Sequence, residues 1–314
     1  MNKNKKILTE LNRVEALIKK DFSKEETISG LYKYIFKSNG KKIRAKLCLV
    51  ASSKTNYKER IKLASVIELL HTATLIHDDV VDNSPTRRGI KSVNNLWTNS
   101  HGVLIGDYIY SKAFIYLVDI GNKKILKELA NTTNDIAQGE LIQLDAIKNV
   151  DINLKKLKKI SYFKTGRLFE AAARTGAIIS NENNIFISNI SECAKNLGIL
   201  FQITDDLLDY SDNKKIGKPV LQDIKEGKVT YPFFYAYKNA NIKQKKYLKE
   251  LLVVSKKIQS KDIELIKGLE GIKKTTQLAD AYHQKAVEYA KKIKNLDIRE
   301  EMIELANTAL NRDK

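Results

Sequence analysis

Residues 63–82 read LASVIELLHTATLIHDDVVD, an apolar segment that ends in three aspartates. Apolar residues recur in it at spacings of three and four, which is the period of one face of an α-helix. The repeating positions are Leu63, Val66, Ile67, Leu70 and Thr74. The segment therefore predicts a long helix whose last turn contains Asp78, Asp79 and Asp82.

A second segment, residues 201–209, reads FQITDDLLD and repeats the spacing of carboxylates at positions i, i+1 and i+4. On a helix, positions i and i+4 are neighbours about 5–6 Å apart, so their like charges repel. The helix dipole also disfavours negative charge at a C-terminal end. A divalent cation would offset both effects, and Mg²⁺ takes carboxylate, phosphate and water oxygens. A solvated acidic helix end is the alternative for one such motif, but two copies after apolar segments favour metal binding.

Basic residues flank both acidic motifs. Arg87 and Arg88 follow the first motif in a turn. The others are Lys41, Lys42 and Arg44 upstream of the first motif, and Lys218 and Lys228 after the second. Arginine and lysine both bind phosphate oxygens, so the pattern indicates a cavity for metal ions and more than one phosphate. The chain has neither GxxxxGK[ST] nor GxGxxG, which argues against ATP or NAD bound in a standard loop.

The rest of the chain also favours helices. Its three prolines, Pro85, Pro219 and Pro232, leave long stretches without the residue that breaks helix interiors. Further repeats of three and four predict helices near residues 7–18, 125–144, 154–168 and 263–269. We find no convincing strand pattern, no linker and no internal repeat. We therefore expect a single all-α domain over residues 1–314.

Composition excludes few classes of protein. The chain has 314 residues, 43% of them hydrophobic, and a formal net charge of +19. A basic chain suggests an anionic partner, yet its lysines are spread along the whole chain, as is typical of solvated surface. Cys48 and Cys193 are far apart, so they indicate no zinc site or disulfide framework and fit a reducing compartment. Because we find no signal-peptide core and no run of about 18 apolar residues, we expect a cytoplasmic protein without a transmembrane segment.

The ordered motifs resemble those of the trans-isoprenyl diphosphate synthases. The resemblance runs from about Gly40 to Pro232. Its densest stretches are residues 68–82, 87–89, 139–143 (GELIQ), 164–170 (KTGRLFE) and 201–209. It implies an isoprenoid-synthase-type bundle of long helices around a deep central cavity, usually in a homodimer. It also implies a Mg²⁺-dependent transferase that condenses isopentenyl diphosphate head-to-tail onto an allylic diphosphate.

The same resemblance implies roles for individual residues. Ligation of Mg²⁺ would be led by Asp78, Asp82 and Asp205, with Asp79, Asp206 and Asp209 in support. The allylic diphosphate would be bound by Arg87, Lys164, Thr165, Gln202, Lys218 and Lys228. Isopentenyl diphosphate would be bound by Lys41, Arg44, His71 and Arg88. A lone histidine beside apolar residues is more often a packed core residue, and we expect that His77 only supports the first motif.

Two small residues bear on the length of the product. Ala73 and Thr74 lie five and four residues before Asp78, where they should project beside a growing chain. In the resembling family, bulky aromatic residues there give short products and small residues allow long ones. The segments at 139–143 and 164–170 are most similar to octaprenyl-type synthases. We therefore expect a long all-trans product of about C30–C45, most simply about C40, which would be a precursor of quinone side chains.

The chain departs from the family pattern at a few positions. Asn39 stands where a second glycine is frequent, and Ala45 where proline is common after the arginine. Leu221 and Gln222 replace the small and acidic residues that are usual before Asp223. None of these changes removes an expected ligand, but they leave the shape of the 217–228 loop open.

Four other functions share some of these sequence features. The nearest is a short-chain synthase that makes geranylgeranyl or farnesyl diphosphate. A terpene cyclase normally carries an Asn/Ser/Glu metal motif in place of the second acidic motif, and a non-catalytic partner subunit would lack one of the two. A basic helical nucleic-acid-binding protein would explain the charge but not the paired carboxylates, so we expect no nucleic-acid partner. A peripheral membrane contact stays open because the expected product is lipophilic.

Overall fold

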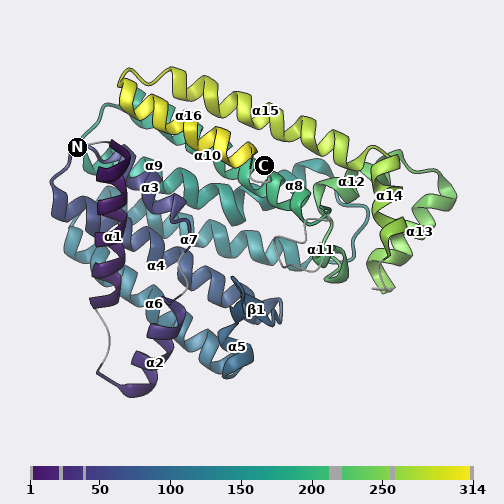
Figure 1. The fold of residues 1–314 in the computed structure, drawn as a ribbon, viewed down its shortest axis with the longest axis horizontal. Coiled ribbons are helices and arrows are strands. Elements are labelled where there is room, and N and C mark those ends of the chain that lie inside the picture. The colour runs from purple at the N-terminus through teal and green to yellow at the C-terminus, as the bar shows by residue number, and fades with distance from the viewer. Residues whose placement is uncertain (1–2, 21–23, 38–39, 212–220, 255–258, 312–314) are drawn as a thin grey trace. The chain divides into compact units, whose positions relative to one another are not determined.

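The chain folds into α-helices joined mostly by short loops, which confirms the predicted fold class (Figure 1). The computed structural model describes residues 3–20, 24–37, 40–211, 221–254 and 259–311. Within these ranges, the only strands form a two-residue antiparallel pair, β1 (Thr86–Arg87) and β2 (Ile90–Lys91). This hairpin follows the first acidic motif and is too short to give a detectable alternation of polar and apolar residues.

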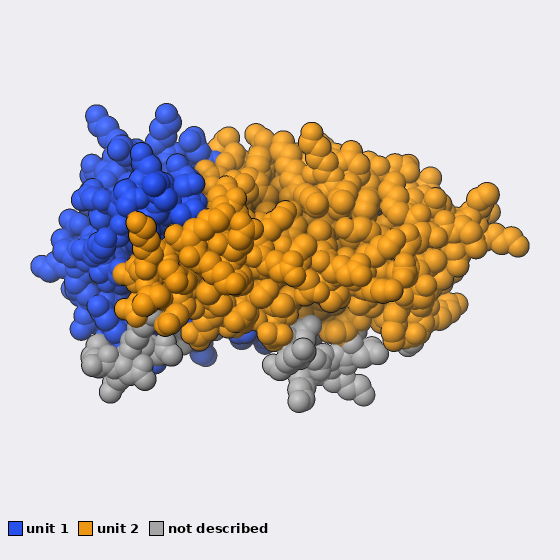
Figure 2. Space-filling view, turned by 90° about the horizontal axis from the view of Figure 1, so that it is seen from above, with its two compact units in different colours: residues 1–133, 171–190 blue, residues 134–170, 191–314 orange. Residues whose placement is uncertain are grey.

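The residues group into two compact units, which Figure 2 distinguishes by colour. Unit 1 consists of residues 1–133 and 171–190, and unit 2 of residues 134–170 and 191–314. The helices α7 (Lys123–Leu144), α9 (Arg167–Ile179) and α10 (Asn184–Leu208) contribute residues to both units. A single domain over the whole chain remains a prediction.

Unit 1 is organised around one long buried helix, α4 (Tyr57–Val81). The other elements of the unit are α1 (Lys3–Lys20), α2 (Glu26–Ile35), α3 (Ile43–Ala51), α5 (Val93–Leu96) and α6 (Asn99–Ile120). Asn56 caps α4 by accepting hydrogen bonds from the N–H groups of Lys58 and Glu59. Residues 63–70 are all buried, as expected for a helix packed along α6 and against α1 and α3. Because α4 ends at Val81, the first acidic motif lies in its last turn, as predicted.

Unit 2 contains α8 (Leu154–Ser161), a π-helical turn η1 (Tyr162–Gly166), and helices from the C-terminal half of the chain. These are α11 (Gln222–Lys225), α12 (Tyr231–Asn239), α13 (Ile242–Val254), α14 (Ser260–Gly268), α15 (Gly271–Lys291) and α16 (Leu296–Leu310). In Figure 1, α15 and α16 run side by side, and α15 also packs against α12. Pro232 lies in the first turn of α12, where the missing N–H is tolerated. The second acidic motif lies at the end of α10.

The predicted helix at 154–168 is interrupted by η1. The buried residues Ile160 and Leu168 are eight positions apart, one more than the seven residues of two α-helical turns. The π turn absorbs the additional residue and keeps both side chains in the core. In the described parts of the chain, no helix has the length and apolar character needed to cross a membrane.

Candidate active site

The first acidic motif presents two carboxylates on one face of α4. Asp82 caps the helix, and its N–H donates to the carbonyl of Asp78 over 2.8 Å. Both residues are half-buried, and their spacing of four places them on one face. These are the two residues of the motif that were expected to lead metal ligation.

Asp79, between them, has a different environment. It is 4% exposed, and its Oδ1 accepts hydrogen bonds from Nε of Arg87, over 2.8 Å, and from Nη2 of the same side chain. Burial raises the pKa of the Asp79 carboxyl, and the Arg87 guanidinium opposes that rise. Asp79 therefore orients Arg87, which was expected to bind the allylic diphosphate.

Arg44 and His71, both expected at the isopentenyl site, are in contact. Nη1 of Arg44 lies 3.0 Å from Nε2 of His71. A guanidinium can only donate, so Nε2 accepts and the neutral ring has its proton on Nδ1. Burial, with the Arg44 guanidinium beside it, lowers the pKa of His71 well below its usual range. His71 is therefore a neutral side chain among cations.

Glu68 is a residue of this region to which the sequence had assigned no role. It is 8% exposed, and its Oε1 accepts the N–H of Ala45 over 3.2 Å. Burial raises the pKa of Glu68, while the Arg44 guanidinium, first among the nearby cations, opposes the rise. A proline at position 45 would have no N–H to donate, so the departure from the family pattern supplies one hydrogen bond to a buried carboxylate.

Three further basic residues near the first motif, Arg88, Lys42 and Lys41, differ in their surroundings. The guanidinium of Arg88 packs on Gly40, where an added Cβ would lie 2.6 Å from Nη2. Lys42, at the start of α3, is bonded to Glu15 of α1 over 2.5 Å, whereas Lys41 is exposed. One pocket of unit 1 brings much of this group together, being lined by Gly40, Lys42, Glu68, Asp79, Arg87 and Arg88 beside Leu75 and Ile76.

The two residues expected to set product length differ in exposure. Ala73 is fully buried. Thr74 is half-buried, and its hydroxyl donates to the carbonyl of His71 over 2.8 Å. Of the two, Thr74 is the one with accessible surface, and their role in product length stays a prediction.

A pocket in unit 2 collects three of the six expected allylic-site residues, Lys164, Gln202 and Lys228. It is lined by Gln143, Lys164, Gln202, Asp206, Asp223, Lys228, Thr230 and Tyr231, together with apolar residues of α8. Lys218 lies outside the described residues. Asp205, in the last turn of α10, is half-buried.

Asp206 is 6% exposed, and two uncharged groups donate hydrogen bonds to it. Its Oδ1 accepts from Nε2 of Gln202 over 2.9 Å, and its Oδ2 accepts from the N–H of Tyr231 over 3.2 Å. Burial raises the pKa of Asp206 to about 7, although both hydrogen bonds oppose the rise. Asp206 is thus the carboxyl of the second motif whose ionisation is opposed by its burial.

Asp209 holds the segment that follows. Its two carboxylate oxygens accept the N–H groups of Gln222, over 2.9 Å, and Asp223, over 3.2 Å. They thereby satisfy the N-terminal donors of α11. Leu221 adopts φ 57° and is fully buried, a strained conformation for a branched side chain where the family usually has a small residue. The described part of the 217–228 loop is thus anchored by the second motif.

Asp223 is a second residue to which the sequence had assigned no role. Burial, with Asp209 and Asp206 nearby, raises the pKa of Asp223 well above its usual range, and Lys228 opposes the rise. Lys228 is itself paired with Glu226 over 2.8 Å. The signal was present in the sequence, because this acid lies five residues before an expected phosphate-binding lysine.

Lys164 and Thr165 are both presented by the π turn η1. Nζ of Lys164 lies 2.8 Å from a carboxylate oxygen of Glu140 and also donates to Gln143. The hydroxyl of Thr165 donates to Oε1 of Gln202 over 2.7 Å. Glu140 and Gln143 lie in the GELIQ segment, so the two densest motifs of this unit are in direct contact.

The donor atoms of both motifs suit a hard divalent cation. They are carboxylate oxygens, without a thiolate or imidazole among them. In the described ranges, no three His, Cys, Asp or Glu side chains are already grouped to hold an ion. Mg²⁺ is commonly held by one or two carboxylates and completed by substrate phosphates and water. The residues therefore fit an ion that arrives with a diphosphate.

The comparisons with known proteins agree with one another. A sequence model of the family described as polyprenyl synthetase matches residues 25–269. The octaprenyl diphosphate synthase of Escherichia coli (strain K12) is 33% identical over 304 residues, which cover 95% of this chain and 94% of that protein. The all-trans-nonaprenyl-diphosphate synthase (geranyl-diphosphate specific) of Rhodobacter capsulatus is 35% identical over 301 residues, which cover 92% and 90%.

A solved structure adds the fold. The polyprenyl synthase from Caulobacter crescentus CB15, complexed with calcium and isoprenyl diphosphate, matches with a TM-score of 0.92 at 30% identity, covering 98% of this chain and 95% of that one. Fold, motifs and relatives thus point to one conclusion: the chain belongs to the polyprenyl synthetase family and has its all-α isoprenoid-synthase fold.

Proposed function

We propose that the protein is a Mg²⁺-dependent trans-polyprenyl diphosphate synthase, which condenses isopentenyl diphosphate head-to-tail onto an allylic diphosphate. The observation that supports this most is the pair of acidic helix ends, each with cationic or amide side chains in contact, in a chain of this family. The calcium and isoprenyl diphosphate in the Caulobacter crescentus structure support a divalent metal at this chemistry.

The reaction assigns a task to each group. Lys164, Thr165 and Gln202 would orient the allylic diphosphate, and Arg44, His71 and Arg88 would bind isopentenyl diphosphate. When the allylic C–O bond breaks, negative charge develops on the diphosphate oxygens, where preorganised cations stabilise it. Bound Mg²⁺ supplies further Lewis-acid stabilisation of that leaving group. The isopentenyl double bond then forms the new C–C bond, and a proton is lost to the departed diphosphate.

We propose a long all-trans product of about C40, which would serve as a quinone side-chain precursor. The octaprenyl and nonaprenyl synthases among the relatives support this length. The small side chains of Ala73 and Thr74 are consistent with it. A geranylgeranyl or farnesyl product has less support, because these relatives are named for longer chains.

We also propose that two copies of the chain associate through α6. Its outer face exposes Leu104, Ile115 and Val118, whose exposed fractions are 67%, 54% and 70%. A shallow hollow lined by Ser111, Phe114, Ile115, Val118 and Asp119 lies on the same helix. Apolar surface of this kind is usually covered by a partner, and a second copy fits the homodimer that the family implies. Light scattering of wild type and Leu104→Glu would test it, with a dimer expected only in the wild type.

A reducing, cytoplasmic site of action is part of the proposal. Cys48 and Cys193 are both buried and unbridged thiols. Burial raises the pKa of each to about 12, so neither is a reactive thiolate. This usage supports a compartment in which disulfides are not formed.

The test of function is a direct incubation. Purified protein is supplied with Mg²⁺, farnesyl diphosphate and labelled isopentenyl diphosphate, with and without a chelator, and the chain length of the product is measured. A chelator-sensitive product of about C40 is expected. A product that stops at C15 or C20 would contradict the assigned length, and no product with any allylic primer would contradict the reaction.

A further inference from the structure

The π turn η1 is the structural feature that sets where Lys164 and Thr165 lie. A π turn is rare, inserts one extra residue into an α-helix, and is found frequently at functional sites. The chain is an ordinary α-helix on both sides of the turn, in α8 and α9. Some feature of the protein must therefore favour the π register over the α register.

Close packing of glycines fixes the position of the turn. A Cβ added to Gly139 of α7 would lie 2.7 Å from Cβ of Phe163, and one added to Gly198 of α10 would lie 2.7 Å from Cα of Gly166. Two neighbouring helices thus approach η1 at backbone distance on different residues. These apolar contacts restrict the path of the backbone at η1, but they include no hydrogen bond that would select the π register.

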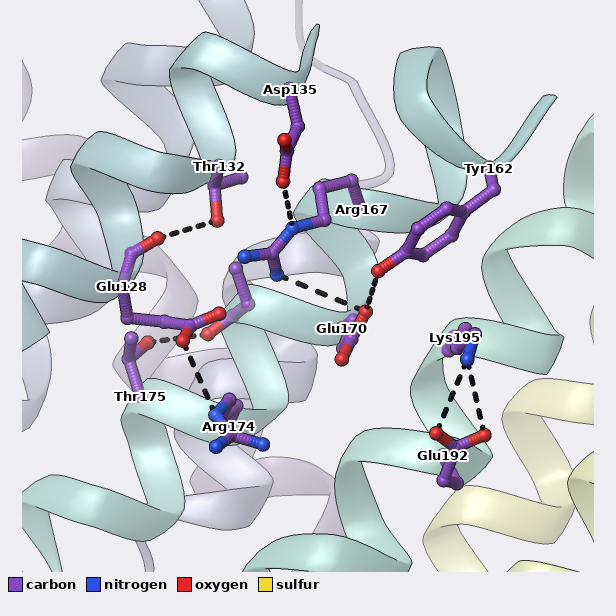
Figure 3. Close-up of polar contacts among 11 residues, drawn as sticks. Glu128, Thr132, Asp135, Tyr162, Arg167, Glu170, Arg174, Thr175, Glu192 and Lys195 are labelled. Carbon is purple, nitrogen blue, oxygen red and sulfur yellow. Dashed lines mark hydrogen bonds and ion pairs between the residues drawn. The ribbon is translucent and has the colours of Figure 1, made fainter. Parts of the chain in front are cut away.

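A polar network supplies the directional bonds (Figure 3). The hydroxyl of Tyr162, the first residue of η1, donates to Oε2 of Glu170 over 2.5 Å. The guanidinium of Arg167, the first residue of α9, donates through Nε to Asp135 of α7 over 2.8 Å. Its Nη1 lies 3.8 Å from the same oxygen of Glu170. The side chains of Arg167 and Glu170 are only 9% and 13% exposed, so their charges require these partners.

The bond from Tyr162 to Glu170 depends on the π register. An α-helix turns about 100° per residue, so residues eight apart point about 80° away from each other. One inserted residue makes the step of eight equivalent to an α-helical step of seven, which leaves a difference of only about 20°. An α-helical register would therefore turn the Tyr162 hydroxyl away from Glu170, and would turn Lys164 with it.

We propose that Tyr162, Glu170, Arg167 and Asp135 form a positioning network that locks η1 in its π register and thereby directs Lys164 and Thr165 at the allylic diphosphate. None of the four is assigned to substrate. Burial and the Glu170 carboxylate raise the pKa of the Tyr162 hydroxyl, which keeps it a proton donor at any working pH. The inference rests on the proposed function, because it takes the allylic diphosphate as the ligand of Lys164 and Thr165.

The test compares Tyr162→Phe with Tyr247→Phe. The hydroxyl of Tyr247 also donates to a carboxylate, that of Asp262, and joins α13 to α14 away from η1. Both variants keep the ring and lose one hydroxyl–carboxylate bond, so they are matched in chemistry. We expect Tyr162→Phe to raise KM for farnesyl diphosphate about tenfold and to leave KM for isopentenyl diphosphate within about twofold. Tyr247→Phe should change neither constant.

Two further measurements separate positioning from general structural damage. In a Lys164→Ala background, Tyr162→Phe should raise KM for farnesyl diphosphate by less than about twofold, because the tyrosine acts through that lysine. Glu170→Leu, which removes the acceptor of the Tyr162 hydroxyl, should show the same selective rise in KM for farnesyl diphosphate as Tyr162→Phe. An equal rise in KM for both substrates, or an unchanged KM for farnesyl diphosphate in both variants, would overturn the inference.

Calorimetric binding of pyrophosphate with Mg²⁺ distinguishes failure of the inference from failure of the proposed function. Tyr162→Phe should weaken this binding about tenfold relative to Tyr247→Phe. If Tyr162→Phe selectively weakens pyrophosphate binding but the wild type elongates no prenyl chain, the proposed function is contradicted and the network is supported. Unchanged pyrophosphate binding in Tyr162→Phe, with an active wild type, would overturn the network alone.

Discussion

The two acidic motifs have the same spacing, yet their central aspartates are stabilised in opposite ways. Asp79 in unit 1 is held by a guanidinium, through two hydrogen bonds from Arg87. Asp206 in unit 2 accepts one side-chain amide and one backbone N–H. Burial raises the pKa of both carboxyls, but only that of Asp206 rises to about 7. The partner of Asp79 comes from β1, whereas Asp206 is held by Gln202 of its own helix α10 and by the N–H of Tyr231 on α12.

The comparison shows which part of a motif is local. The spacing at i, i+1 and i+4 fixes which carboxylates share a helix face, and this is the same in α4 and α10. The charge state of the central aspartate depends on residues 8 and 25 positions further along the chain, Arg87 and Tyr231. The same spacing therefore predicts which carboxylates share a helix face, but not the electrostatic environment of each carboxylate.

The largest expected effect comes from removing the leading carboxylate of either motif. Asp78→Asn and Asp205→Asn should each lower kcat about 1000-fold or more, because metal ions supply several kcal/mol of stabilisation to the developing charge. Steady-state kinetics would measure it, with the exposed Asp280→Asn as a control that keeps the wild-type rate. If one motif tolerates the change, the two are not equivalent in ligation.

A substitution at Thr74 can make the first motif resemble the second. Four residues before its leading aspartate, α4 has Thr74, whereas α10 has Phe201, which packs on Phe169 with ring centroids 5.3 Å apart. Thr74→Phe should shorten the product from about C40 to C20 or less, because the side chain blocks space beside the growing chain. Chromatography of the products would measure this, and Thr74→Ser should keep the long product. A long product from Thr74→Phe would place the limit of length elsewhere.

The pH dependence of stability should distinguish Asp206 from a solvated acid. An unfolded aspartate has a pKa of about 3.9, so between about pH 4 and 7 the folded protein retains a proton that the unfolded chain has lost. The sign is therefore negative: as pH rises through this window, the free energy of unfolding falls by up to about 1.4 kcal/mol per pH unit. Denaturation in a chelating buffer should show this slope in wild type.

The matching variant is Asp206→Asn, which cannot titrate. Its free energy of unfolding should change less with pH between pH 4 and 7 than that of wild type, by up to the slope of one proton. Asp280→Asn, an exposed change on α15, should keep the wild-type slope. Parallel curves for wild type and Asp206→Asn would mean that Asp206 ionises normally.

The smallest effect tests the one departure from the family pattern that has a visible partner. Ala45→Pro removes the N–H that Glu68 accepts and should lower the free energy of unfolding by about 1 kcal/mol. In a Glu68→Ala background, the same proline should cost less, since the acceptor is gone. Urea denaturation of the four proteins measures the coupling, and equal losses in both backgrounds would remove the role of this hydrogen bond.

The sequence predicted the all-α class, several of the helices and the placement of both acidic motifs, because apolar periodicity and proline positions are local signals. It also placed Asp78, Asp82 and Asp205 at helix ends, where the structure shows them half-buried. It did not predict that Asp79 orients Arg87 or that Asp209 caps α11. Those contacts depend on loops whose course is set by tertiary packing.

The π turn shows the same limit in a subtler form. The sequence predicted one helix through residues 154–168, and the step of eight from Ile160 to Leu168 was the only trace of the extra residue. Glycines 139 and 198, which admit the turn, lie on other helices. The apolar pattern of one segment cannot predict the π register of η1, because that register also depends on α7 and α10.

We propose that both acidic motifs serve one and the same condensation reaction. The most direct test is the single-turnover rate with farnesyl diphosphate and labelled isopentenyl diphosphate in Asp78→Asn, Asp205→Asn and the double variant. Groups that act as a unit are strongly non-additive, so the double variant should be no slower than the slower single variant, within about threefold. Rates that multiply, or a single variant with the wild-type rate, would contradict the claim.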